Sequence, residues 1–147
     1  MHNRYRKGIF CVVYDSNPAS YLLLHRKLHW QGWEFPKGGC LAREKTENAV
    51  KRELKEETGL KAISIKQFPI TGSFVYDKKT QAERKFKGFR YVLFACSVKR
   101  GKIKLDKKEH DNYKWCSYPQ AIRLLTWPNQ RKCLKIVNNA IRKTSLT

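Results

Sequence analysis

The chain has 147 residues, about one globular domain, and 41% of them are hydrophobic, which excludes a fully disordered polypeptide. No apolar run reaches the ~20 residues of a membrane span, and the start lacks the apolar stretch of a signal peptide, so we expect a cytoplasmic protein without membrane contacts. The net charge of +20 admits nucleic acid, nucleotides or anionic lipid as partners. Five scattered cysteines, never spaced C-x-x-C, argue against a disulfide framework or a zinc site.

The first 45 residues predict a hairpin followed by a loop. β-Branched and aromatic runs at residues 8–14 and 21–25 predict two strands, and residues 15–18 (Asp-Ser-Asn-Pro) have the composition of the turn between them. Residues 30–39 are rich in glycine, proline and aromatic side chains, which favours a structured loop.

A helix is predicted over residues 46–58. The segment contains no glycine or proline, Thr46 is a candidate N-cap, and Gly59 stands where a left-handed C-terminal cap belongs.

The second half predicts more strands and then two helices. The expected elements are strand segments within 63–76 broken at Pro69 and Gly72, a polar connection at 77–83, a strand at 89–98, a charged loop at 103–112, a short strand at 113–116, and helices at 117–125 and 128–143. This order suggests one α+β or α/β domain, residues 1–147, with a mixed sheet between helices.

Five of the twelve acidic residues fall within 14 positions: Glu44, Glu47, Glu53, Glu56 and Glu57. On a helix, the last three span an arc of about 100° and therefore share one face, where like charges repel. A divalent cation would remove that repulsion, and a ligand set of carboxylates suits Mg²⁺ or Mn²⁺. The alternative is a solvated helix face whose charges Lys51 and Lys55 screen.

The flanking residues decide between these interpretations. The spacing Gly-x5-Glu-x7-Arg-Glu-Leu-x-Glu-Glu-x-Gly-Leu, over residues 38–60, resembles the signature box of the Nudix hydrolases. Its fixed positions here are Gly38, Glu44, Arg52, Glu53, Leu54, Glu56, Glu57, Gly59 and Leu60. The resemblance implies an α/β/α sandwich, and it implies metal-dependent hydrolysis of a nucleoside diphosphate linked to another group.

The same resemblance assigns roles within the box. It implies that Glu53, Glu56 and Glu57 bind the metal ion together with the backbone carbonyl of Gly38. Arg52 would hold a glutamate of the box in place through a charge-assisted contact.

The general base varies within the family. One candidate is a box glutamate, Glu53 or Glu56. The other is Glu109, which precedes a short predicted strand as the family's late-loop glutamate does, although a charged turn is the competing interpretation. The neighbouring His110 is expected to be a surface histidine.

Substrate contacts are expected from cations and aromatic rings. Lys37, in the Phe-Pro-Lys-Gly-Gly version of the loop, Arg26 at the end of the second strand, and Lys87 are the candidates for binding phosphate. Tyr76 is the first choice for stacking on a nucleobase, and Tyr91 is another candidate.

The loop at residues 33–39 and the segment 121–134 look most like the asymmetric dinucleoside tetraphosphatase branch, so diadenosine tetraphosphate is the favoured substrate. RNA 5′-end pyrophosphohydrolase or decapping activity is the alternative, because the loop also occurs there and the charge of +20 would hold an RNA chain. ADP-ribose and oxidised nucleotides are weaker candidates. A nucleotide-binding module without activity is disfavoured because no box glutamate is missing.

Overall fold

The computed structural model describes residues 2–16 and 19–145, so residues 17 and 18 of the expected turn lie outside the described residues. The strands are β1 (Tyr5–Ser16), β2 (Ala19–Arg26), β3 (Gly32–Glu34), β4 (Lys37–Gly39), β5 (Ala62–Val75), β6 (Gly88–Val98) and β7 (His110–Cys116). The helices are α1 (Thr46–Thr58), α2 (Lys78–Arg84), α3 (Tyr118–Leu124) and α4 (Pro128–Ser145).

The strands form a mixed sheet with the order β3-β2-β1-β6-β5, in which β4 also pairs with β1 and β7 also pairs with β2. The central strands β1 and β6 are parallel, with Ile9 opposite Val92. The other pairings are antiparallel, including the expected hairpin of β1 and β2. Two hydrophobic faces result, and each needs a covering layer.

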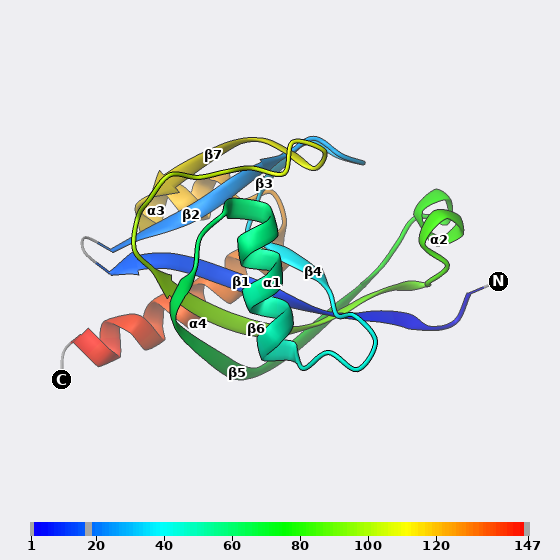
Figure 1. Cartoon of the computed structure of the whole chain (residues 1–147), viewed down its shortest axis with the longest axis horizontal. Helices are drawn as coiled ribbons and strands as arrows, with labels where there is room; N and C mark the ends of the chain where they lie inside the picture. The colour runs from blue at the N-terminus through cyan, green and yellow to red at the C-terminus, as the bar shows by residue number, and fades with distance from the viewer. Residues whose placement is uncertain (1, 17–18, 146–147) are drawn as a thin grey trace.

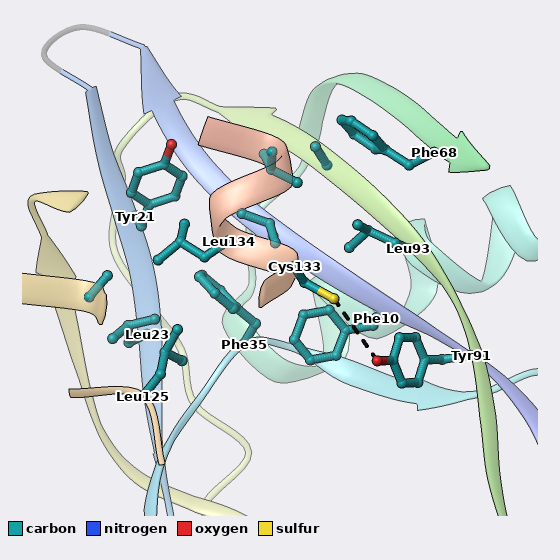
Figure 2. Close-up of a cluster of buried hydrophobic side chains, with 14 of the residues drawn as sticks. Phe10, Tyr21, Leu23, Phe35, Phe68, Tyr91, Leu93, Leu125, Cys133 and Leu134 are labelled. Carbon is teal, nitrogen blue, oxygen red and sulfur yellow. Dashed lines mark hydrogen bonds between the residues drawn. The ribbon is translucent and has the colours of Figure 1, made fainter. Parts of the chain in front are cut away.

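Helices cover both faces (Figure 1): α1 lies on one side of the sheet, and α3 and α4 lie on the other. Under α4, Cys133, Leu134 and Val137 pack against aromatic side chains of the sheet (Figure 2). The predicted α/β/α sandwich with a mixed sheet is therefore confirmed. Within the described ranges, the helices are all too short or too polar to span a bilayer.

Helix α1 has the predicted bounds, and its apolar side fixes it to the sheet. Ala49, Val50 and Leu54 are completely buried in the second core. Gly59 has φ 76° and donates its N–H to the carbonyl of Lys55, so the predicted left-handed cap is confirmed. The predicted N-cap at Thr46 is wrong: the cap position is Lys45, which makes no side-chain capping bond.

Two segments differ from the expectation because their elements are short. The loop at residues 30–39 contains the strands β3 and β4, which are three residues long each. They join the sheet because β3 pairs with β2 and β4 pairs with β1. The connection at residues 77–83 is largely helix α2, which buries no side chain and therefore shows no apolar period. Its local signal is Asp77, whose carboxylate accepts the N–H of Thr80 at 2.7 Å.

The strands of the second half are longer than predicted. β5 is continuous from Ala62 to Val75, and Pro69 only shifts its register with β6, between Gln67 and Thr71. β7 begins at His110 rather than at residue 113.

Replacing Gly59 with alanine should destabilise the fold, because an L residue at this positive φ costs about 1–2 kcal/mol. Gly101→Ala is the matched control, since a Cβ there would make only ordinary contacts at 3.8 Å or more. Urea unfolding should show a loss of about 1–2 kcal/mol in the free energy of unfolding for Gly59→Ala and under ~0.5 kcal/mol for Gly101→Ala. Equal stabilities would contradict the role of Gly59 as the end of α1.

Candidate active site

The loop that carries Gly38 lies directly against α1. Pairing of β4 with β1 places Gly38 opposite Ile9. A Cβ on Gly38 would stand only 2.1 Å from the carboxyl carbon of Glu53. Only glycine therefore lets this backbone approach the carboxylate so closely. Metal binding by the Gly38 carbonyl stays a prediction.

Arg52 ties the loop to the helix. Its Nε and Nη2 donate to the two carboxylate oxygens of Glu44 at 2.9 and 2.8 Å, and Nη2 also donates to the carbonyl of Gly39 at 2.8 Å. Its Nη1 reaches Glu53 at 2.8 Å and Glu56 at 3.3 Å. The hydrogen bond from Arg52, with that from the Leu41 N–H, lowers the pKa of Glu44 to about 2. Arg52 thus makes the contact with a box glutamate that the family resemblance implies.

The three glutamates in the last two turns of α1 differ sharply in exposure. Glu57 is 3% exposed, whereas the side chains of Glu53 and Glu56 are 13% and 57% exposed. Glu53 and Glu57 therefore point into the protein, and Glu56 stands at the rim. A solvated helix face is the wrong interpretation for Glu53 and Glu57.

Glu57 is a buried carboxylate with one oxygen, Oε2, that lacks a hydrogen-bond partner among the described residues. Burial, reinforced by the negative charges of Glu53, Glu34 and Glu109, raises the pKa of Glu57 well above its usual range. Burial also raises the pKa of Glu53, although Arg52 opposes that shift. A divalent cation would satisfy Glu57 and offset these charges, so the donor set fits a hard metal ion.

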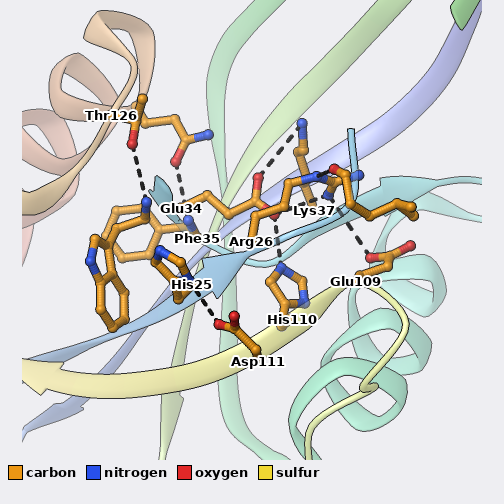
Figure 3. Close-up of polar contacts among 12 residues, drawn as sticks. His25, Arg26, Glu34, Phe35, Lys37, Glu109, His110, Asp111 and Thr126 are labelled. Atoms are coloured by element: carbon orange, nitrogen blue, oxygen red, sulfur yellow. Dashed lines mark hydrogen bonds and ion pairs between the residues drawn. The ribbon is translucent and has the colours of Figure 1, made fainter. Parts of the chain in front are cut away.

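A second buried carboxylate, Glu34, has the opposite environment (Figure 3). Its Oε2 accepts a hydrogen bond from Arg26 Nη1 at 3.1 Å and lies 2.8 Å from Nε2 of His110, and its Oε1 lies 3.7 Å from Lys37 Nζ. Burial alone would raise the pKa of Glu34, but Lys37, His110 and Arg26 together lower it. Glu34 thereby fixes two predicted phosphate-binding cations.

Sequence reasoning missed this network. His110 is completely buried, so the expectation of a surface histidine is wrong. Glu34 lies in the loop at residues 33–39, where the sequence predicts no role for it. The sequence carries no signal for it, because β3, which turns Glu34 inward, is only three residues long.

A cavity of about 640 Å³ opens beside these groups. Its lining combines carboxylates, cations and aromatic rings: Glu53, Asp77, Glu109, Arg6, Arg26, Lys37, Arg84, Trp30, Phe74, Tyr76, Phe89 and Trp127. Five predicted residues of the site therefore line one space with Glu53, namely Arg26, Lys37, Gly38, Tyr76 and Glu109. The Tyr76 ring is covered by the Arg84 guanidinium at 5.3 Å, and Lys37 Nζ lies 5.0 Å from the Phe74 ring.

Two predicted substrate contacts are not in this cavity. Lys87 is exposed and does not line it; its backbone N–H binds the carbonyl of Arg4. Tyr91 is 5% exposed and packs in the core between Phe10 and Phe89, with its hydroxyl 4.0 Å from Sγ of Cys133 (Figure 2). Because alternation along β6 turns Tyr91 toward α4, its assignment as a nucleobase platform is wrong.

Glu109 joins the box glutamates in space. It directly precedes β7, and its carbonyl accepts the N–H of Lys27. Ligand atoms of Glu57, Glu109 and His110 all lie within 4.8 Å of one another. The late-loop residue predicted as base or metal ligand is thus adjacent to the buried box glutamate.

The NUDIX domain model matches residues 4–135. The chain belongs to the Nudix family. A curated relative in a Nitratiruptor species, named RNA pyrophosphohydrolase, is 31% identical over 84% of this chain and 85% of its own length. A protein of the same name in Pseudomonas aeruginosa is 28% identical over 70% of this chain and 72% of its own. The family match and these relatives together identify the chain as a Nudix pyrophosphohydrolase.

Solved structures show the same Nudix fold. The Escherichia coli dihydroneopterin triphosphate pyrophosphohydrolase superposes with a TM-score of 0.73 at 21% identity, over 90% of this chain and 96% of that one. A Caenorhabditis elegans Ap4A hydrolase gives 0.68 at 22% identity, over 92% and 98%.

Replacing Glu57 with glutamine tests whether its burial serves a cation. Mg²⁺ at ~100 times its dissociation constant should add about 2.7 kcal/mol to the wild-type free energy of unfolding. Glu57→Gln should lose most of that gain, and its metal-free form should be more stable than the wild type, because no buried charge remains. Thermal unfolding with and without Mg²⁺ measures both effects.

Glu47→Gln, on an exposed first-turn position of the same helix, is the matched control and should keep the full Mg²⁺ response. An undiminished Mg²⁺ response in Glu57→Gln would contradict this account of the buried carboxylate.

Proposed function

We propose that this Nudix pyrophosphohydrolase cleaves the 5′-polyphosphate of an RNA, using Mg²⁺ or Mn²⁺ held by Glu53, Glu56 and Glu57 with the carbonyl of Gly38. The observation that carries the proposal is the shared cavity: Glu53 and Glu109, which can hold a cation, line it together with Arg26 and Lys37, which can hold phosphate. Bound there, the ion would neutralise phosphate oxygens and lower the pKa of the attacking water.

The residues of this chain would do the remaining work. Arg26 and Lys37, held by Glu34, would bind phosphate oxygens and orient the chain for attack. Glu109 has a side chain that is 34% exposed in the cavity, where it can take a proton from water, and Glu53 is the other candidate base. Tyr76 and the neighbouring aromatic rings would stack on the first nucleobase.

Two observations favour RNA over a small nucleotide. The relatives named RNA pyrophosphohydrolase are up to 31% identical over most of their length, whereas the Ap4A hydrolase structure is 22% identical. The net charge of +20 far exceeds what one polyphosphate needs, and it would bind the phosphates of an RNA body.

A dinucleoside tetraphosphate, the substrate that the sequence favours, is the second candidate. It is supported by two separate aromatic groups in the cavity: Phe74 with Tyr76, and Trp30 with Trp127, each pair in edge-to-face contact. Two such groups could hold the two bases of one substrate.

A substrate panel separates these candidates. We expect kcat/KM to be highest for an RNA of about 20 nucleotides with a 5′-triphosphate, ahead of diadenosine tetraphosphate, ADP-ribose and oxidised dGTP, and to vanish when EDTA removes the metal. A 5′-triphosphorylated dinucleotide is the matched control: its kcat/KM should fall less steeply with salt than that of the longer RNA, because fewer phosphates are contacted.

If diadenosine tetraphosphate is preferred by a wide margin, the RNA assignment is wrong and the dinucleotide assignment replaces it. Full activity in EDTA would contradict both.

A further inference from the structure

His110 is a buried polar residue in the site, and its environment differs both from that of an exposed charged turn and from that of an apolar core position. It is the first residue of β7 and pairs with Arg26 of β2, next to a register shift in that strand. Its imidazole is completely buried. Because a buried polar ring normally satisfies both nitrogens, each contact of this ring is informative.

The contact with Glu34 fixes the tautomer of His110. Nε2 lies 2.8 Å from Glu34 Oε2, whose carboxylate also faces the cations of Arg26 and Lys37 and is therefore ionised. An ionised carboxylate only accepts hydrogen bonds, so Nε2 carries the proton. In the neutral ring, Nδ1 is then left with its lone pair.

That lone pair has no hydrogen-bond partner among the described residues. The buried Oε2 of Glu57 also lacks one, and the two side chains belong to the same cluster, whose ligand atoms lie within 4.8 Å of one another. Two buried acceptors without partners in one cluster of side chains are costly in a folded protein. A cation bound within this cluster would satisfy both.

We propose that Glu57, Glu109 and His110 form a metal site with one nitrogen ligand, in which Glu34 orients the imidazole. The arrangement of carboxylate, histidine and metal is a recurrent way to fix a ligating ring. The site shares Glu57 with the box carboxylates of the proposed function and so rests on that proposal, but it adds an imidazole that the box does not contain.

The ligand set indicates which ion binds. Mg²⁺ prefers oxygen ligands and retains its waters, whereas imidazole suits first-row transition metals. We therefore expect the site to prefer Mn²⁺ or another divalent ion of that row over Mg²⁺. Glu109 lines the cavity and is partly exposed, so the ion would enter from the cavity past Glu109.

Electron spin echo envelope modulation of the Mn²⁺-loaded, full-length protein tests this directly, because it detects nitrogen bound to Mn²⁺. We expect a ¹⁴N signal in the wild type that changes to the ¹⁵N pattern when the protein is labelled with [¹⁵N]histidine. His110→Gln should lose the signal and bind Mn²⁺ at least ~10-fold more weakly, with little change in Mg²⁺ affinity.

His25→Gln is the matched control. His25 lies on β2 and contacts Asp111 through Nδ1 at 2.7 Å, outside the cluster, so this variant should keep the nitrogen signal. If His110→Gln fails to fold, His29→Gln completes the test: His29 also lines the cavity, and the labelled nitrogen signal should persist in that variant if His110 is the ligand. A signal lost in His29→Gln would overturn the assignment to His110.

A wild-type protein saturated with Mn²⁺ but without nitrogen coupling would overturn the nitrogen-ligand site and leave the proposed function intact, since the box glutamates would still bind the ion. A protein that binds no Mn²⁺ at all would overturn both.

Discussion

The burial of Glu57, whose Oε2 finds no hydrogen-bond partner in the part of the chain that the structure describes, is the constraint on which the rest of the site depends. An uncompensated buried charge costs several kcal/mol, and the surrounding carboxylates increase that cost. The fold nevertheless holds Glu57 in place, because Ala49, Val50 and Leu54 anchor α1 to the sheet and Gly59 ends the helix. Packing of α1 in the core therefore offsets the cost of burying the Glu57 carboxylate where a cation can bind it.

The two buried glutamates show how environment separates their tasks. Glu34 is surrounded by Arg26, Lys37 and His110, which lower its pKa and hold it ionised, so it serves as an anchor for cations. Glu57 faces other carboxylates, and its pKa rises. The same type of side chain thus positions cations at Glu34, whereas at Glu57 it would be stabilised by a bound ion. The cavity beside them is lined by carboxylates and by cations, which suits the metal ion and the polyphosphate of the proposed function.

The sequence predicted the features that depend on regular spacing. The bounds of α1, the cap at Gly59 and the mixed sheet with helices on both faces followed from composition and periodicity, and the box spacing identified the family. Lys37, Arg26, Tyr76 and Glu109 were expected at the site, and all of them line the cavity with Glu53. These positions depend mainly on local chain order, which a single sequence carries.

The errors concern features that tertiary contacts decide. Helix α2 and the three-residue strands β3 and β4 are too short for a periodic signal. Tyr91 is buried in the core by its place in β6, Lys87 is exposed outside the cavity, and His110 is buried where β7 pairs with β2. No spacing rule reveals that His110 forms a hydrogen bond with Glu34, which lies 76 residues before it in the chain.

Anomalous X-ray diffraction from crystals grown with Mn²⁺ is the most direct test of the central claim that Glu57 is buried to hold a cation. We predict an anomalous peak within bonding distance of Glu57 Oε2. A cavity without such a peak, in which Glu57 Oε2 is satisfied by a protein hydrogen bond instead, would contradict that claim.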